Sequence, residues 1–143
     1  MNRNRDYFNI NQSNKYKMEI NEISSQIHAN AVEKGFWDGT ETFNSDQLCK
    51  RLLLIISEVT EAMEADRKNK YCKQEKAGGT YLEDRHFIKN FEENIKDTLE
   101  DELADATIRI FDLAKKMNID LESHIKAKHR YNTTRPRMHG KKY

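Results

Sequence analysis

The chain has 143 residues, enough for one domain with its own core, and it is 36% hydrophobic and 34% charged. A single Pro, five Gly and little Val favour an all-α fold built from amphipathic helices and exclude a sheet protein. The formal net charge of +1 gives no indication of nucleic-acid or membrane-surface binding. No apolar run reaches the roughly 20 residues of a membrane span. Cys49 and Cys72 match no zinc spacing, and two free thiols favour the cytoplasm.

Residues 1–17 are polar and rich in Asn, so we expect a flexible N-terminal arm before a single domain over 18–143. The first helix is predicted over 18–33 and ends at Gly35, a typical residue after a helix. The loop that follows contains Phe36 and Trp37. These aromatic rings can stack on a flat ligand or close the end of a helical bundle, and the pattern favours the second.

The most strongly periodic segment, residues 46–67, predicts a long amphipathic helix that Asn44 or Ser45 caps. Its apolar residues recur at helical spacing and predict a buried stripe: Leu48, Leu52, Ile55, Ile56, Val59 and Met63. Glu58 and Glu61 lie together on the flank of that stripe. Because their neighbours are apolar, we expect this flank to be half-buried.

An insertion around residues 70–90 contains Gly78-Gly79, which breaks any helix there. The third helix is predicted to begin between 87 and 97 and to end near 117, and its Glu102 and Asp105 repeat the acidic spacing of the second helix. A second apolar side on this helix, formed by Ala104, Ile108 and Phe111, favours a subunit contact. A fourth helix over 121–131 is followed by a basic tail.

If the second and third helices pack antiparallel, their four carboxylates converge, and four anions share a half-buried site only around a cation. Oxygen ligands favour Mg²⁺ or Mn²⁺ over zinc and copper. A di-iron centre is the rival, but it requires Glu-x-x-His motifs in core helices, and the one such motif, at Glu83 and His86, falls in the insertion. Bases in the tail provide the charge to hold a phosphate, although a basic tail that binds no ligand has the same composition.

The segments SEVTEAMEADR and EDELADATIRIFDLA resemble the all-α MazG-like nucleoside triphosphate pyrophosphohydrolases, whose signature is Glu-x-x-Glu followed by Glu-x-x-Asp. NAVEKGFWD and KHRYNTTRPRMHGKK resemble the beginning and end of the same fold, so the resemblance spans roughly residues 20–142. It implies a four-helix (MazG-like) bundle unit assembled as a homodimer or homotetramer. The implied activity is Mg²⁺-dependent hydrolysis of a nucleoside triphosphate to the monophosphate and pyrophosphate, as nucleotide-pool housecleaning.

The same resemblance implies a role for each of eleven residues. Glu58, Glu61, Glu102 and Asp105 are the implied metal ligands, with Glu58 and Glu61 catalytic; Lys128, Asn132, Arg135 and Lys141 contact phosphate; Asn30, Lys34 and Trp37 line the nucleoside site. Two departures from the family pattern leave open the general base and the number of metal ions. The gap between the acidic motifs is longer than usual, and Ser57 stands where the family often has another acid.

Two alternatives remain from the sequence. A phosphoribosyl-ATP pyrophosphohydrolase has the same acidic geometry, but its isolated members are shorter and lack the aromatic loop. A non-catalytic helical interaction module has its acids on a solvated face and its basic tail against an acidic partner. Binding of Mg²⁺ distinguishes an enzyme from such a module.

Overall fold

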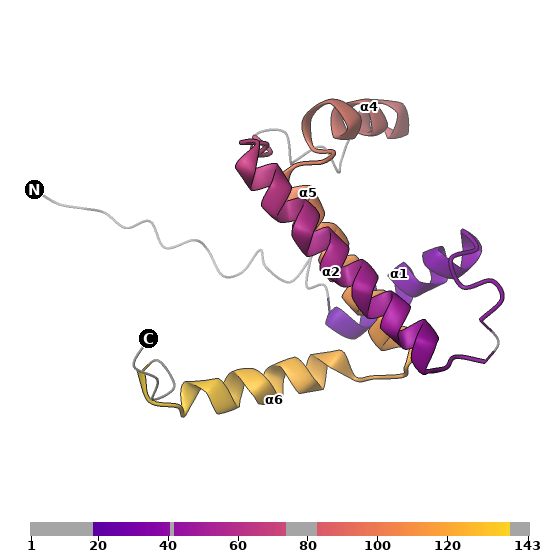
Figure 1. Cartoon of the computed structure of the whole chain (residues 1–143), viewed down its shortest axis with the longest axis vertical. Helices are drawn as coiled ribbons and strands as arrows, with labels where there is room; N and C mark the ends of the chain where they lie inside the picture. Colours follow the sequence, from indigo (N-terminus) through magenta and orange to yellow (C-terminus); the bar gives the residue numbers. More distant parts are fainter. Residues whose placement is uncertain (1–18, 41, 74–82, 138–143) are drawn as a thin grey trace, which may run out of the picture.

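The computed structural model of the chain describes residues 19–40, 42–73 and 83–137 (Figure 1). These ranges form helices and no strand, as the composition predicts: α1 (Ile20–Glu33), α2 (Ser45–Arg67), α4 (Asp84–Asn94), α5 (Leu99–Lys116) and α6 (Leu121–Thr133). None of these helices has the length and hydropathy of a membrane-spanning segment. The predicted arm, Gly78-Gly79 and Lys141 lie outside the described residues.

Local sequence signals determine where the helices begin and end. Asn44 caps α2 in a capping box with Gln47, and Asp120 caps α6 by accepting a hydrogen bond from the Ser123 amide. Gly35 follows α1 with φ +78°, and Asn118 follows α5 with φ 54°. Gly and Asn adopt this left-handed conformation at low cost, so both residues stop their helices where the sequence predicts a stop.

The predicted third helix is two helices, which makes five helices among the described residues instead of four. The chain breaks at Asp97, whose φ is 59°, and the Asp97 amide donates to Asp101 Oδ2 over 2.9 Å. Thr98 then caps α5, its hydroxyl accepting from the Asp101 amide. Competing side-chain bonds to the backbone therefore end α4 and restart the helix at Leu99.

The antiparallel pair of α2 and α5 is the centre of the fold (Figure 1). The end of α2 lies at the start of α5, where the Leu99 amide donates to the Lys70 carbonyl over 3.0 Å. α1 packs on α5, and α6 packs mainly on α1 and extends away from the pair (Figure 1). A small core joins α1, the loop after it and α5 through Ala31, Trp37 and Leu113.

The buried face of α2 differs from the predicted stripe. Glu58, Ala62 and Ala65 are the buried residues of α2, and of the six stripe residues Leu48 and Ile55 pack against the core. The other four, Leu52, Ile56, Val59 and Met63, are exposed. The helix is therefore turned by about one residue, roughly 100°, from the predicted orientation. Small side chains at the contact, including Ala106 of α5, let the two helices approach closely.

Candidate metal centre

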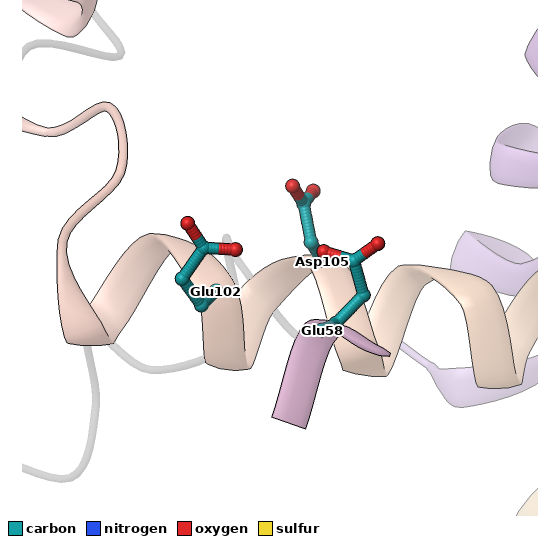
Figure 2. Close-up of side chains that lie close together, drawn as sticks. All are labelled: Glu58, Glu102 and Asp105. Carbon is teal, nitrogen blue, oxygen red and sulfur yellow. The ribbon is translucent and has the colours of Figure 1, made fainter. Parts of the chain in front are cut away.

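Three carboxylates converge between α2 and α5. Glu58 comes from α2, whereas Glu102 and Asp105 lie one turn apart on α5, and one oxygen of each lies within 4.8 Å of the others. Figure 2 shows Glu102 and Asp105 projecting from α5 while Glu58 reaches the site from α2. Glu58 and Glu102 are buried, at 5% and 7% exposure. The structure thus brings together three of the four predicted metal ligands.

Burial and the charges of neighbouring acids disfavour the charged forms of Glu102 and Asp105. Burial raises the pKa of Glu102 above its ordinary value, and the charges of Glu61, Asp101 and Glu58 raise it further. Partial burial, Asp101 and Glu58 likewise raise the pKa of Asp105, while Arg109 opposes them. A site that holds protons more tightly than isolated carboxyls is short of positive charge, which a divalent cation supplies.

Arg109 supplies one positive charge within the chain. Its Nε and a terminal nitrogen each lie 2.6 Å from Glu58 Oε1, so one guanidinium neutralises the most buried acid of the cluster. Arg109 follows Asp105 by one helical turn on α5. The i, i+4 spacing of Asp105 and Arg109 is visible in the sequence and places Arg109 near the acids, but the predicted site does not include Arg109.

Glu61, the fourth predicted ligand, lies on the exposed side of α2 one turn beyond Glu58. It lines a pocket of about 300 Å³ with Glu102, and Lys68 and Lys70 lie on the wall of the same pocket. Glu61 is close enough to raise the pKa of Glu102 by its charge. Its carboxylate therefore borders the cluster without belonging to the group of three.

A second pocket, of about 310 Å³, lies beside Asp105 on the side of α1. Its lining combines apolar, amide and charged groups: Ile27, Asn30, Ala31, Phe36, Arg51, Asp105, Ile108, Arg109 and Asp112. Asp105 belongs both to this wall and to the carboxylate cluster, so a ligand in the pocket lies beside the acids. The volume is at the lower end of the range for small-molecule sites.

The two loop aromatics have different environments. Trp37 is 6% exposed, and its indole nitrogen donates to both carboxylate oxygens of Asp112 over 3.0 and 3.1 Å. His28 contacts the same Asp112 at 2.6 Å and stacks edge-on against Trp37. Trp37 therefore closes the end of the bundle, as the sequence pattern favours, and its ring is not on the pocket surface. Phe36 is 63% exposed and lines the pocket.

Of the other residues implied for the nucleoside, Asn30 lines this pocket, whereas Lys34 lies on the surface near Glu33. Arg51 is a pocket residue that the sequence analysis does not single out. It donates to the Phe36 carbonyl over 2.5 Å, and its guanidinium lies 4.1 Å from the centre of the Trp37 ring. Arg51 thereby fixes the aromatic loop against α2.

The predicted phosphate contacts lie on and beyond α6. Lys128 and Asn132 border a shallow hollow of α6 itself, and Lys128 and Arg135 lie over the ring of Tyr131. None of the three lines either pocket beside the acids. Their role toward phosphate stays a prediction, while Arg51 and Arg109 are the cations of the pocket on the α1 side.

Comparisons with protein-family models, curated proteins and solved structures find no match to this chain.

Proposed function

We propose that the chain is a Mg²⁺-dependent nucleoside triphosphate pyrophosphohydrolase that releases pyrophosphate and the monophosphate. The observation that carries the proposal is the position of Asp105, in the wall of the arginine-bearing pocket and also in the carboxylate cluster. The cluster suits a hard divalent cation, and the pocket suits a small anionic ligand. The MazG-like resemblance of the sequence supplies the reaction that combines the two.

Glu58, Glu102 and Asp105 are the residues that would hold Mg²⁺. All three would bind the ion through carboxylate oxygens. Two of the three side chains are buried, and the pKa values of Glu102 and Asp105 are raised, so a divalent cation would offset the cost of holding their negative charges together. Mn²⁺ accepts the same ligands. When bound, the ion supplies Lewis-acid activation of water and neutralises charge on the phosphate oxygens.

The pocket on the α1 side orients the nucleotide. The exposed face of Phe36 stacks on the base, and the side-chain amide of Asn30 hydrogen-bonds to its edge. Arg51 and Arg109 hold the triphosphate oxygens, since guanidinium groups bind phosphate in a bidentate manner. The α-phosphorus then lies toward Asp105 and the acidic cluster.

Glu61 is positioned to accept the proton of the attacking water. It borders the cluster, it is exposed, and no basic group forms an ion pair with it in the described part of the chain. Lys68 and Lys70 lie in the same pocket and neutralise charge on the departing pyrophosphate. In this scheme Glu58, Glu102 and Asp105 would bind the metal, and Glu61 would accept the proton.

The test is a panel of ribo- and deoxynucleoside triphosphates assayed for pyrophosphate release, with Mg²⁺ and with EDTA. We expect turnover of at least one member, dependent on Mg²⁺, with pyrophosphate and not phosphate as the product. Phe36→Ala should raise KM about tenfold with a smaller change in kcat, because stacking on the base is lost.

Ile88→Ala is the matched control, because Ile88 is an exposed apolar residue of α4 outside both pockets. Release of phosphate alone, or turnover that EDTA leaves unchanged, contradicts the proposed reaction. Failure of the whole panel, together with the absence of Mg²⁺ binding, favours the helical interaction module instead.

A further inference from the structure

The pocket on the α1 side contains a carboxylate that the proposed reaction does not use. Asp112 of α5 lines its wall together with Arg51 and Arg109, and Asp112 is not one of the three acids of the cluster. A negative charge repels a triphosphate, so electrostatics alone would make Asp112 weaken the binding that the pocket is proposed to provide. The contacts of Asp112 indicate a different role.

Asp112 holds two ring side chains from the segment that precedes α2. The Trp37 indole nitrogen donates to both carboxylate oxygens, over 3.0 and 3.1 Å, and His28 Nδ1 lies 2.6 Å from Asp112 Oδ1. The two rings meet edge-on, with their centres 5.5 Å apart. The Asp112 side chain is 14% exposed, so these contacts are largely shielded from water. The carboxylate therefore fixes the plane of the Trp37 ring.

The Trp37 ring in turn supports Arg51. The Arg51 guanidinium lies 4.1 Å from the centre of the ring, and it also donates to the Phe36 carbonyl over 2.5 Å. Without these two contacts, the long Arg side chain would regain its rotamer freedom, and binding a ligand would have to order it again. The orientation of Arg51 therefore depends on Asp112 through Trp37, although Asp112 and Arg51 form no ion pair with each other.

Arg51 is also the arginine of the pocket whose charge is not paired with an acid. Arg109 binds the buried Glu58, with two nitrogens 2.6 Å from the same carboxylate oxygen. Among the described residues, Arg51 contacts a carbonyl oxygen and a ring face but no carboxylate. Its positive charge and its planar set of donors remain available for a phosphate. A change in the orientation of Arg51 should therefore change the affinity of the pocket for an anion.

We infer that Asp112 is a positioning residue, which holds Arg51 through Trp37 in the orientation that binds the triphosphate. This role rests on the proposed function, because the triphosphate is the ligand that Arg51 would bind. It accounts for a carboxylate in the wall of an anion pocket, since the hydrogen bonds of Asp112 to Trp37 order the arginine that attracts the anion. The same contacts fix Phe36, whose backbone carbonyl accepts from Arg51.

Calorimetric titration with inorganic triphosphate and Mg²⁺ tests this role, because two substitutions of Asp112 should have different effects. Asp112→Ala removes the charge and both acceptor oxygens, so Trp37 and Arg51 lose their support and Kd should rise about tenfold or more. Asp112→Asn removes the charge but keeps one acceptor oxygen for the indole nitrogen, so Kd should be equal to that of wild-type protein or lower. A purely electrostatic role predicts instead that both variants bind more tightly.

Lys116→Met is the matched control. Lys116 Nζ lies 5.0 Å from the centre of the same Trp37 ring, but Lys116 is outside the lining of the pocket. Its substitution removes a cation beside Trp37 and leaves the hydrogen bonds to Asp112 intact, so Kd should stay within about threefold of the wild-type value. If Asp112→Ala fails to fold, Trp37→Phe takes its place. That variant keeps a ring in the core, lacks the donor to Asp112 and should also raise Kd about tenfold.

A second measurement needs no ligand and separates the positioning role from the proposed function. In ¹⁵N NMR spectra, the Arg51 Nε proton is identified by its loss in Arg51→Lys. The ring current of Trp37 should shift this signal in wild-type protein and in Asp112→Asn, whereas in Asp112→Ala it should appear where an unstructured arginine does.

Two results overturn the positioning role. One is an Asp112→Ala variant that binds inorganic triphosphate as tightly as wild-type protein or more tightly, and the other is an Arg51 signal that stays shifted in that variant. A wild-type protein that does not bind inorganic triphosphate contradicts the proposed function. In that case the Arg51 signal still decides whether Asp112 positions Arg51.

Discussion

Replacing Glu102 by Gln should stabilise the metal-free protein while abolishing its response to Mg²⁺. The substitution keeps the size of a buried side chain and removes one of three charges whose oxygens lie within 4.8 Å. At that separation, two like charges repel by roughly 3.5 kcal/mol at an effective dielectric constant of ~20 and by roughly 0.9 kcal/mol in water. Asp105 is partly solvated and Arg109 neutralises Glu58, so we expect a net gain of about 1–2 kcal/mol in unfolding free energy.

The assay is urea unfolding followed by circular dichroism at neutral pH, in EDTA and in excess Mg²⁺. Mg²⁺ at about 100 times its Kd should stabilise wild-type protein by roughly 2.7 kcal/mol, because the ion binds only the folded cluster. Glu102→Gln should show less than about a third of that gain, since one ligand loses its charge. Glu102→Gln should therefore unfold at a higher urea concentration than wild-type protein in EDTA and at a lower one in excess Mg²⁺.

Glu93→Gln is the control for loss of a negative charge, because Glu93 is an exposed residue of α4 that pairs loosely with Lys89. It should leave stability and the Mg²⁺ response unchanged. A Glu102→Gln variant that is less stable than wild type in EDTA and equally stabilised by Mg²⁺ refutes the reasoning. In that case Glu102 is held by hydrogen bonds, and the carboxylates are not an electrostatically strained metal site.

Two further substitutions test the charges around the fold. Arg109→Met removes the cation that neutralises Glu58, so the Mg²⁺ affinity measured by calorimetry should rise while KM for the triphosphate rises about tenfold or more; an unchanged KM would show that Arg109 serves only the acids. Asp120 has its pKa lowered from 3.8 to about 2 by hydrogen bonds from Asn21 and Ser123. A lowered folded pKa means that this stabilisation is complete above pH 3.8 and is lost as the pH falls through about 2. Wild-type protein should therefore lose melting temperature over this range, and Asp120→Ala should lose less.

Helix positions were predictable because their signals are local. Asn44 and Asp120 cap the helices that the periodicity predicts, and Gly35 and Asn118 stop the preceding ones. The spacing of Glu58, Glu102 and Asp105 was sufficient to predict the convergence of three acids, because antiparallel packing brings equivalent positions together. The break at Asp97 was not predicted, because the hydrogen bond from the Asp97 amide to the Asp101 carboxylate does not change the spacing of the apolar residues.

The side of α2 that faces α5 was less predictable than the ends of the helix, because α2 has two faces suited to burial. The aliphatic stripe has the stronger hydrophobic signal, but Ala62 and Ala65 allow the closer approach and face α5. A single sequence does not separate a side chain buried within one chain from one buried against another. Val59 and Met63 of the aliphatic stripe are exposed in the structure, although their spacing predicts burial.

The roles of arginines and aromatics depended on neighbours far apart in the sequence. Trp37 is held in the core by its hydrogen bond to Asp112, which is 75 residues away in the sequence. Arg109 donates to Glu58, which is 51 residues away. No pattern in the sequence predicts the contact of Trp37 with Asp112, and the i, i+4 spacing of Asp105 and Arg109 places Arg109 near the acids without predicting its contact with Glu58. Of the residues that line the pocket, Asn30 and Asp105 were predicted as site residues, whereas Asp112 and the two arginines were not.

Binding of Mn²⁺, followed by the electron paramagnetic resonance signal of the free ion, tests the metal centre most directly. Wild-type protein should remove Mn²⁺ from solution saturably, Mg²⁺ should displace it, and Glu58→Gln with Glu102→Gln should abolish the binding, whereas Glu93→Gln should not. Retention of binding in the double variant, or no binding by wild-type protein at millimolar Mn²⁺, would contradict the metal site.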